Sequence, residues 1–273
     1  MLTRTLALLL RSADSAGVLT VGGVLTLLTW TVTPLWVVST VAFPPLVVLA
    51  PLALAPAFVT RGYFVRVLSD AAESENIDGA PPFVAWNELY KNGVKSAALS
   101  VILLAPLALL FVLVGLAGFV LGTELVDPTA ITDPVEDALG AGGTAAIVGL
   151  GAGTLTVVSA AYLVVFAYVR PASLAIFAVS GRFRNGLHPK RVGRVAGSKT
   201  YATAWLVAAV TMLIGYVIAT PLIPVLIGVV IIFMTRIVLY ALYGHGAGPI
   251  VSDENRTIDP EHESTRPTIL KQS

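Results

Sequence analysis

The sequence contains no cysteine, which excludes disulfides, thiolate metal sites and cysteine nucleophiles. Charged residues are also scarce: they make up 12% of the 273 residues, whereas 56% are hydrophobic. A soluble domain carries about 25% charged residues, because its exterior must face water. The composition therefore predicts an all-α, polytopic membrane protein, and the net charge of +1 gives no reason to expect a nucleic-acid partner.

Catalytic and cofactor motifs are missing as well. There is no phosphate-binding Gly-x-x-x-x-Gly-Lys, no zinc-binding His-Glu-x-x-His and no nucleophile motif Gly-x-Ser-x-Gly. The histidines at 188, 245 and 262 have no metal-ligand spacing. The predicted spans lack Asp, Glu, Lys and His, which ion-coupled transporters and intramembrane proteases usually place at depth. We therefore expect no catalytic residue, metal or cofactor, and a protein that is not an enzyme.

Long uncharged stretches predict the membrane spans. Positions 15–60 carry no charge, and as one helix they would be about 69 Å long, more than twice the ~30 Å hydrocarbon core. This stretch must fold back, with a turn near Ser39-Thr40 and with Pro34 and Pro44-Pro45 as competing turn sites. We expect about six helices in a transmembrane domain of residues 17–245, at about 17–38, 42–65, 96–121, 145–169, 200–219 and 222–243. Pro221 and Pro224 mark the last turn.

The two ends of the chain are predicted to lie outside the membrane domain. In residues 1–16, Arg4 and Arg11 flank a short run of leucines, which is typical of an amphipathic cytoplasmic segment. Residues 246–273 are polar and of mixed charge, and we expect a disordered cytoplasmic tail.

The distribution of basic residues predicts the orientation. Lys and Arg occur in the N-terminal segment, in the 61–95 and 170–199 loops and at the C-terminal end, whereas the 122–144 loop has five acids and no base. Because basic loops stay cytoplasmic, we expect a multi-pass protein of the cell membrane with both termini inside.

The two basic loops also suggest an internal repeat. A shift of 104 residues aligns Arg66 with Arg170, Ser69 with Ser173, and Gly93-Val-Lys95 with Gly197-Ser-Lys199. Both copies would run in the same direction, as a parallel duplication. Chance alignment of small residues is the alternative.

The first basic loop contains a predicted interfacial segment. Phe83, Trp86, Leu89 and Tyr90 fall on one face of a helix started by Pro81-Pro82, which would lie in the membrane interface. Before it comes an acidic stretch, Asp70 to Asp78, which could dock on the bases of the other loop and join the two halves.

The second loop carries seven bases and no acid between Arg170 and Lys199. Anionic lipid headgroups at the cytoplasmic face are the expected partners, at about 1 kcal/mol for each base near the surface. The alternative is that these bases only set the topology.

Arg236 is the one charge predicted well inside a span. It could snorkel to the inner surface, or it could join Arg66 and Arg170 in an anion or lipid-headgroup site at the inner helix ends.

Several short motifs in order resemble the domain-of-unknown-function 4013 family of archaeal and bacterial membrane proteins. They are Gly22-Gly23-Val-Leu-Thr-Leu-Leu, Arg61-Gly-Tyr63-Phe-Val-Arg66, Pro82-Phe-x-x-Trp86, Asn92-Gly-Val-Lys95, Arg170-Pro-Ala-Ser-Leu-Ala and Tyr201-Ala-Thr-Ala-Trp205. The chain departs from the pattern where Val84-Ala85 replaces an acidic or amide pair. The resemblance implies a membrane protein and no catalytic residues, since the family has no established function.

Two functions remain open at this point. The first is a non-enzymatic membrane-organising or assembly protein, whose partner is a second copy or another membrane protein. The Gly118-x-x-x-Gly122 and Gly149-x-x-x-Gly153 pairs favour it, because they permit close helix contact. The alternative is a small-solute or lipid transporter that uses the second span, broken by Pro44, Pro45, Pro51 and Pro56, and the interface between the halves.

Overall fold

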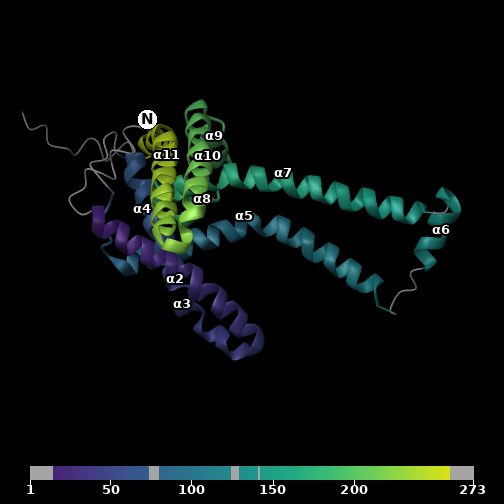
Figure 1. Cartoon of the computed structure of the whole chain (residues 1–273). Helices are drawn as coiled ribbons and strands as arrows, with labels where there is room; N and C mark the ends of the chain where they lie inside the picture. The colour runs from purple at the N-terminus through teal and green to yellow at the C-terminus, as the bar shows by residue number, and fades with distance from the viewer. Residues whose placement is uncertain (1–14, 74–79, 124–128, 141, 259–273) are drawn as a thin grey trace, which may run out of the picture. The chain divides into compact units, whose positions relative to one another are not determined.

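The computed structural model describes residues 15–73, 80–123, 129–140 and 142–258, and within these ranges the regular elements are helices (Figure 1). Six helical stretches are long and apolar enough to cross a membrane. They are Ala16–Ala42, Pro44–Glu73, Trp86–Leu121, Gly143–Ser180, Lys199–Val225 and Ile227–Val251. The all-α, six-span architecture is therefore confirmed, although most helices extend beyond the predicted ends. The N-terminal segment predicted for residues 1–16 lies almost wholly outside the described residues.

The first hairpin turns at Phe43, a few residues later than the preferred site at Ser39-Thr40. Helix α2 (Ser15–Ala42) ends there, and η1 (Pro44–Leu49), α3 (Ala50–Ala53) and α4 (Ala55–Glu73) follow. The residue before a proline is restricted to extended conformations, and Phe43 adopts one with φ −139° and ψ 89°. Thus the competing proline pair sets the turn. The indole Nε1 of Trp36 donates to Leu46 O at 2.9 Å across it.

The second hairpin turns at the predicted prolines. Helix α10 (Lys199–Ala219) leads into η2 (Thr220–Val225), and α11 (Ile227–Ile258) follows after Leu226, which has a left-handed φ of 63°. The last helix is longer than predicted. Residues 246–258, expected to begin the disordered tail, are helical, and residues 259–273 lie outside the described residues.

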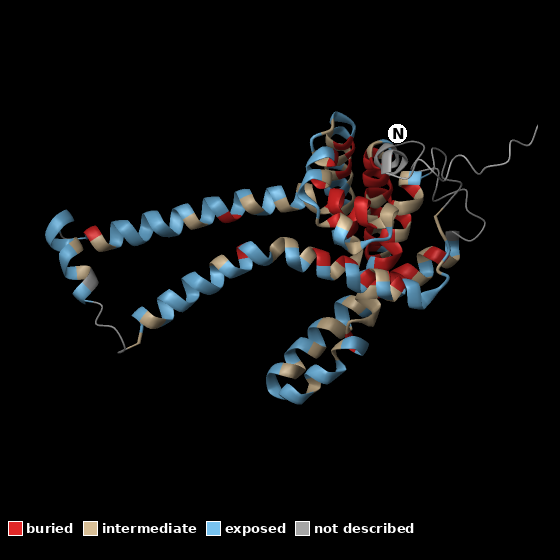
Figure 2. Cartoon of the chain, turned by 180° about the vertical axis from the view of Figure 1, so that it is seen from behind, coloured by how far each residue is buried: buried red, intermediate tan, exposed pale blue. Residues whose placement is uncertain are grey.

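Helix α11 is the centre of one compact unit, formed by residues 1–99 and 171–273. It contacts α2, α4 and α10, and 67% of its apolar 18-residue stretch is buried. Figure 2 shows most of the buried residues in this unit. Its largest fully buried side chains include Tyr63, Leu68, Leu89, Phe177, Tyr201, Phe233 and Leu242.

Three glycines let α11 approach its neighbours closely beyond the predicted end of the span. A Cβ at Gly244 or Gly248 would meet the backbone of α4 at Leu68 and Ala72, and one at Gly246 would meet Ala204 of α10. Glycine pairs four residues apart are a recognised device for packing apolar helices. These contacts explain why the helix continues where polar composition predicted disorder.

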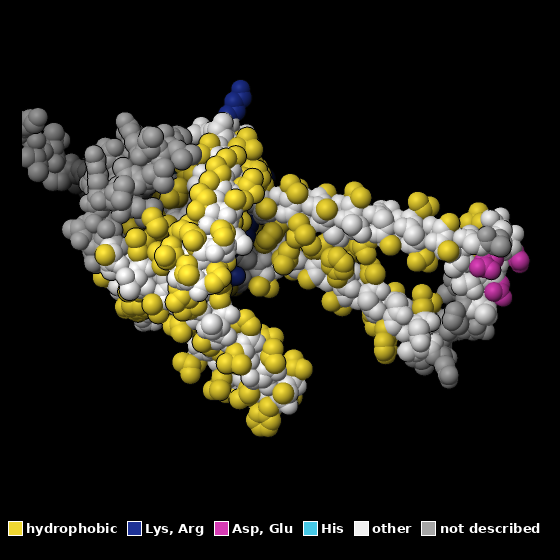
Figure 3. Space-filling view, viewed as in Figure 1, with side chains coloured by type: hydrophobic (Ala, Val, Ile, Leu, Met, Phe, Trp, Pro, Cys, Tyr) yellow, Lys and Arg dark blue, Asp and Glu magenta, His cyan; other side chains and the backbone are white. Residues whose placement is uncertain are grey.

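The second compact unit is a helical hairpin of residues 100–170. It consists of most of α5 (Trp86–Leu121), α6 (Thr129–Leu139) and the first part of α7 (Gly143–Ser180). Tyr162 Oη donates to Leu103 O between the two long helices. Hydrophobic side chains project along both of them, and acidic side chains lie on α6 (Figure 3).

The predicted interfacial segments take two different forms. The first is not a separate helix: Trp86 is the first residue of α5, which continues without a break into the span. After α7, the second loop forms α8 (Phe183–Gly186) and α9 (Pro189–Ala196). Helix α9 is amphipathic, with Val192 and Val195 buried and Lys190 and Arg194 exposed.

Candidate functional site

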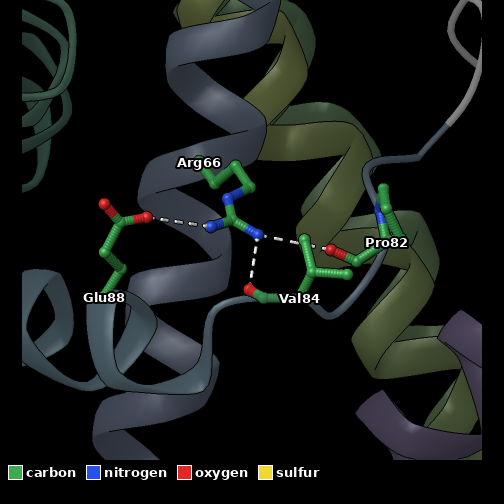
Figure 4. Close-up of polar contacts among 4 residues, drawn as sticks. All are labelled: Arg66, Pro82, Val84 and Glu88. Atoms are coloured by element: carbon green, nitrogen blue, oxygen red, sulfur yellow. Dashed lines mark hydrogen bonds and ion pairs between the residues drawn. The ribbon is translucent and has the colours of Figure 1, made fainter.

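Arg66 joins α4 to the segment that precedes α5. Its Nη1 donates to Val84 O at 2.8 Å and to Pro82 O at 3.4 Å. Its Nη2 lies 3.6 Å from Glu88 Oε2. Figure 4 shows the guanidinium between these three groups. The charge of Arg66 is thus satisfied by acceptors from the protein itself.

The local sequence explains why these carbonyl groups can accept from a side chain. Pro81 and Pro82 prevent a helix in this segment, and Ala85 has a left-handed φ of 57° just before α5 begins. The carbonyl groups of Pro82 and Val84 therefore lie outside any helix. Val84 O accepts from Arg66, and Pro82 O accepts both from the backbone N–H of Val84 at 2.9 Å and from Arg66. Glu88 stands in the first turn of α5, where a negative charge also stabilises the helix.

Aromatic rings pack beside this arginine. Tyr63 stacks on Phe83 with ring centroids 4.1 Å apart, and Phe83 stacks on Trp86. The ring centroid of Phe233, on α11, lies 5.7 Å from the ring centroids of both Tyr63 and Phe64. We call Tyr63, Phe64, Phe83, Trp86 and Phe233 the aromatic cluster. Tyr63 is fully buried, and its hydroxyl has no hydrogen-bond partner in the described part of the chain. The cluster fixes the segment before α5 against α4 and α11.

The four residues of the predicted interfacial face are brought near one another, but they do not form a lipid-facing row. Phe83 precedes the helix and packs inward. Leu89 is buried, and its backbone lies against Gly62 of α4. Tyr90 packs edge-on against Phe58, whereas Trp86 is 49% exposed. The helix starts at Trp86, and Phe83, Leu89 and Tyr90 pack inward.

The three arginines of the predicted anion site each have partners of their own. Arg66 has the partners given above. Arg170 Nε donates to Ser100 Oγ at 2.8 Å. Arg236 Nε and Nη2 lie 3.3 and 3.1 Å from Tyr216 Oη. A common site for the three stays a prediction, and sequence reasoning missed Tyr216 because no local motif marks it.

The position of Arg236 along its helix also differs from the prediction. The predicted span ended near residue 243, which placed Arg236 close to the inner end. Because α11 runs from Ile227 to Ile258, Arg236 lies in its first third, nearer the η2 end.

In the proline-broken second span, aromatic side chains donate to two backbone carbonyl groups. Trp36 Nε1 donates to Leu46 O, and Tyr90 Oη donates to Pro51 O at 3.3 Å. These carbonyl groups are satisfied within the protein, so they do not need a solute or ion.

The residues matched by the repeat and by the acidic docking hypothesis have mixed outcomes. Ser69 Oγ donates to Ala178 O of α7, whereas its predicted counterpart Ser173 is buried with no hydrogen-bond partner among the described residues. Glu73 accepts from Ser69 within α4. Residues 74–79 of the acidic stretch lie outside the described residues, so the docking and the repeat stay predictions. In the described ranges, no group of three or more His, Asp or Glu could hold a metal ion.

Comparison with known proteins identifies one family. The model of the family described as "Protein of unknown function (DUF4013)" matches residues 46–225, which is more than half of the chain. No curated protein and no solved structure matches the chain. The matched range includes Arg66 and its carbonyl partners, together with Tyr63, Phe83 and Trp86.

Proposed function

The chain belongs to the DUF4013 family of proteins of unknown function, and on that premise we propose that it is a non-enzymatic membrane protein that self-assembles. The proposed contact is between two copies of the hairpin of residues 100–170, through α7. In the proposed orientation both termini and α9 lie on the cytoplasmic side of the cell membrane. The exposed bases Lys190 and Arg194 of α9 would then contact anionic lipid headgroups.

The observation that carries this proposal is that glycines have different surroundings in the two compact units. In the unit built around α11, glycines of the long helices lie against other helices: Gly22 faces Phe233, Gly62 faces Leu89 and Gly215 faces Thr235. In the hairpin, nothing lies within 4 Å of a Cβ added at Gly149 or Gly153, and the same holds for Gly115, Gly118 and Gly151. A helical glycine costs about 1 kcal/mol relative to alanine. Close helix packing repays that cost, whereas contact with lipid does not.

Three glycines of α7 are open, and two of them, Gly149 and Gly153, lie on one side of the helix, whereas Gly151 lies on the opposite side. Gly149 and Gly153 are four residues apart and therefore neighbours on the helix surface. Tyr162, which reaches α5, lies nine residues after Gly153 and points about 180° away at 3.6 residues per turn. A second helix can thus reach the glycine side without displacing α5.

A second copy of the chain is the partner that this side of α7 fits. A Gly-x-x-x-Gly pair is complementary to itself, because two such helices can cross with their glycines in contact. A twofold axis then brings the same surface of each copy together. Transport stays the alternative, but two carbonyl groups of the proline-broken span, those of Leu46 and Pro51, already accept from Trp36 and Tyr90.

Cysteine cross-linking in native membranes tests the assembly, since the chain has no cysteine of its own. Thr156 lies on the glycine side of α7 and Thr154 lies away from it; both are exposed, and each hydroxyl bonds the carbonyl four residues back. We expect Thr156→Cys to form a disulfide-linked dimer on oxidation and Thr154→Cys to remain a monomer. Adding Gly153→Leu to Thr156→Cys should abolish the dimer, whereas Gly151→Leu should not.

Three outcomes would contradict the proposal. They are equal cross-linking from positions 154 and 156, no cross-linking from either, and a product that contains a different protein. The last would keep the assembly role and replace the second copy by another membrane partner.

A further inference from the structure

Arg236 is a basic residue within an apolar helix, and its hydrogen-bond partner is a neutral side chain. It lies in the span Ile227–Val251 and is half-buried. The side chains on its side of α11, Val229, Ile232 and Leu239, are all buried. In the described part of the chain its hydrogen-bond partner is Tyr216 Oη, which accepts from both Nε and Nη2.

A guanidinium in such surroundings is stabilised by a counter-charge or by further hydrogen bonds. It has five N–H donors and a fixed positive charge, whereas a tyrosine hydroxyl is neutral. Removing a charge from water is costly unless an opposite charge or several hydrogen bonds replace the water. The charge of Arg66, by comparison, is balanced by a carboxylate, and its N–H groups donate to two carbonyl oxygens. Among the described residues, no acidic side chain forms an ion pair with Arg236.

The geometry also indicates the side from which an anion would reach this arginine. Tyr216 stands in the last turn of α10, next to η2. Side chains on a helix tilt toward its N-terminus, and the N-terminus of α11 is also at η2. The guanidinium therefore points to the η2 end of the α10–α11 hairpin. In the orientation proposed above, that end faces the outside of the cell.

We propose that Arg236 and Tyr216 form a binding site for a phosphate-bearing anion that enters from the outer side of the membrane. Arginine suits this ligand because its planar N–H groups match the oxygens of a phosphate. Tyr216 orients the guanidinium and can donate its own hydroxyl proton to the anion. The phosphate can belong to a lipid headgroup of the outer leaflet or to a soluble phosphate. The inference depends on the proposed orientation and not on the proposed dimer.

Native mass spectrometry of the full-length protein, purified in a neutral detergent, tests the site. The probes are phosphatidylglycerol, phosphatidylcholine and inorganic phosphate, each titrated separately. The variants are Arg236→Gln, Arg236→Lys and Tyr216→Phe. Arg182→Gln is the matched control, since Arg182 is an exposed base just before α8.

We expect the unmodified protein to bind one phosphate-bearing ligand. Arg236→Gln should weaken that binding at least about tenfold, the factor that corresponds to a lost charged hydrogen bond. Arg236→Lys should keep part of the affinity, Tyr216→Phe should lose less than Arg236→Gln, and Arg182→Gln should bind as the unmodified protein does. Binding of phosphatidylglycerol alone identifies a lipid site, whereas saturable binding of inorganic phosphate identifies a soluble ligand.

Equal affinities in Arg236→Gln and Arg182→Gln would overturn the inference. If Arg236→Gln does not fold, Tyr216→Phe decides instead, and an unchanged affinity in that variant would also overturn it. Cross-linking of Thr156→Cys in the same preparation reports separately on the dimer. Loss of the cross-link with retained binding therefore refutes the assembly and leaves the anion site standing.

Discussion

At the scale of single residues, Arg66 and Arg236 have different hydrogen-bond partners. Arg66 is surrounded by two backbone carbonyl groups and Glu88, whereas Arg236 has a tyrosine hydroxyl. The first arrangement is structural, because the acceptors belong to the segment before α5 and to the first turn of α5, which Arg66 holds in place. The different surroundings are why we assign a ligand to Arg236 and a positioning role to Arg66.

We predict that Arg66→Gln lowers the free energy of unfolding by about 1–2 kcal/mol, because a charged hydrogen bond to a carbonyl contributes roughly 1.5–3 kcal/mol and Arg66 is partly exposed. Glu88→Gln should cost less than about 0.5 kcal/mol, since the Glu88 side chain is 71% exposed and exposed ion pairs are weak. Thermal melting in detergent measures both. Equal losses in the two variants would show that the ion pair, and not the carbonyl contacts, carries the effect.

At the scale of helices, glycine sets how closely α4 and α5 approach. A Cβ on Gly62 would overlap the carbonyl oxygen of Leu89, and one on Gly93 would overlap that of Phe58. The contact is thus reciprocal: each helix presents a glycine to the backbone of the other. The aromatic cluster and the Arg66 contacts lie beside this crossing, so the position of the segment before α5 depends on it.

We predict that Gly62→Ala and Gly93→Ala each destabilise the protein by about 1–3 kcal/mol, the usual cost of overfilling a packed interface. Gly118→Ala is the control, because nothing lies within 4 Å of a Cβ there. It should leave the stability unchanged or raise it by up to about 1 kcal/mol, since alanine favours a helix more than glycine does. Chemical or thermal unfolding measures the stability of each variant and distinguishes Gly62→Ala and Gly93→Ala from the control. A neutral Gly62→Ala would refute the close crossing.

At the scale of the molecule, α11 organises the unit of residues 1–99 and 171–273. It lies in contact with α2, α4 and α10, and its glycines continue that packing past residue 243. The C-terminal part of α11 is therefore a structural element of the membrane protein, although its composition alone suggests a solvated tail.

We predict that a chain ending after Tyr243 is markedly less stable than one ending after Ile258. The shorter chain lacks Gly244, Gly246 and Gly248, which face α4 and α10, while the longer chain keeps these contacts. Expression level and melting temperature in detergent measure the difference. If both chains melt alike, the helical end of α11 contributes nothing to the fold.

Much of the architecture could be predicted from the sequence, because long apolar stretches need about 20 residues to cross a bilayer and few alternatives satisfy the backbone. The six spans and the turn at Pro221 and Pro224 follow from this constraint. The first turn was missed by a few residues since several prolines compete there. Of the candidate site, the sequence analysis singled out the segments Arg61–Arg66 and Pro82–Trp86 as motifs of the family resemblance, but it did not predict the contacts between them.

The sequence by itself determined that this is a helical membrane protein, because composition and the length of apolar runs are properties of the chain. Only the tertiary structure decided which residues meet. The acceptors of Arg66 come from a segment 16 to 18 residues away, and Tyr216 reaches Arg236 from the neighbouring helix. The periodicity of the sequence does not predict such pairs, since they depend on how the helices cross. The end of α11 was also decided by packing, because glycines that weaken an isolated helix stabilise one held between two neighbours.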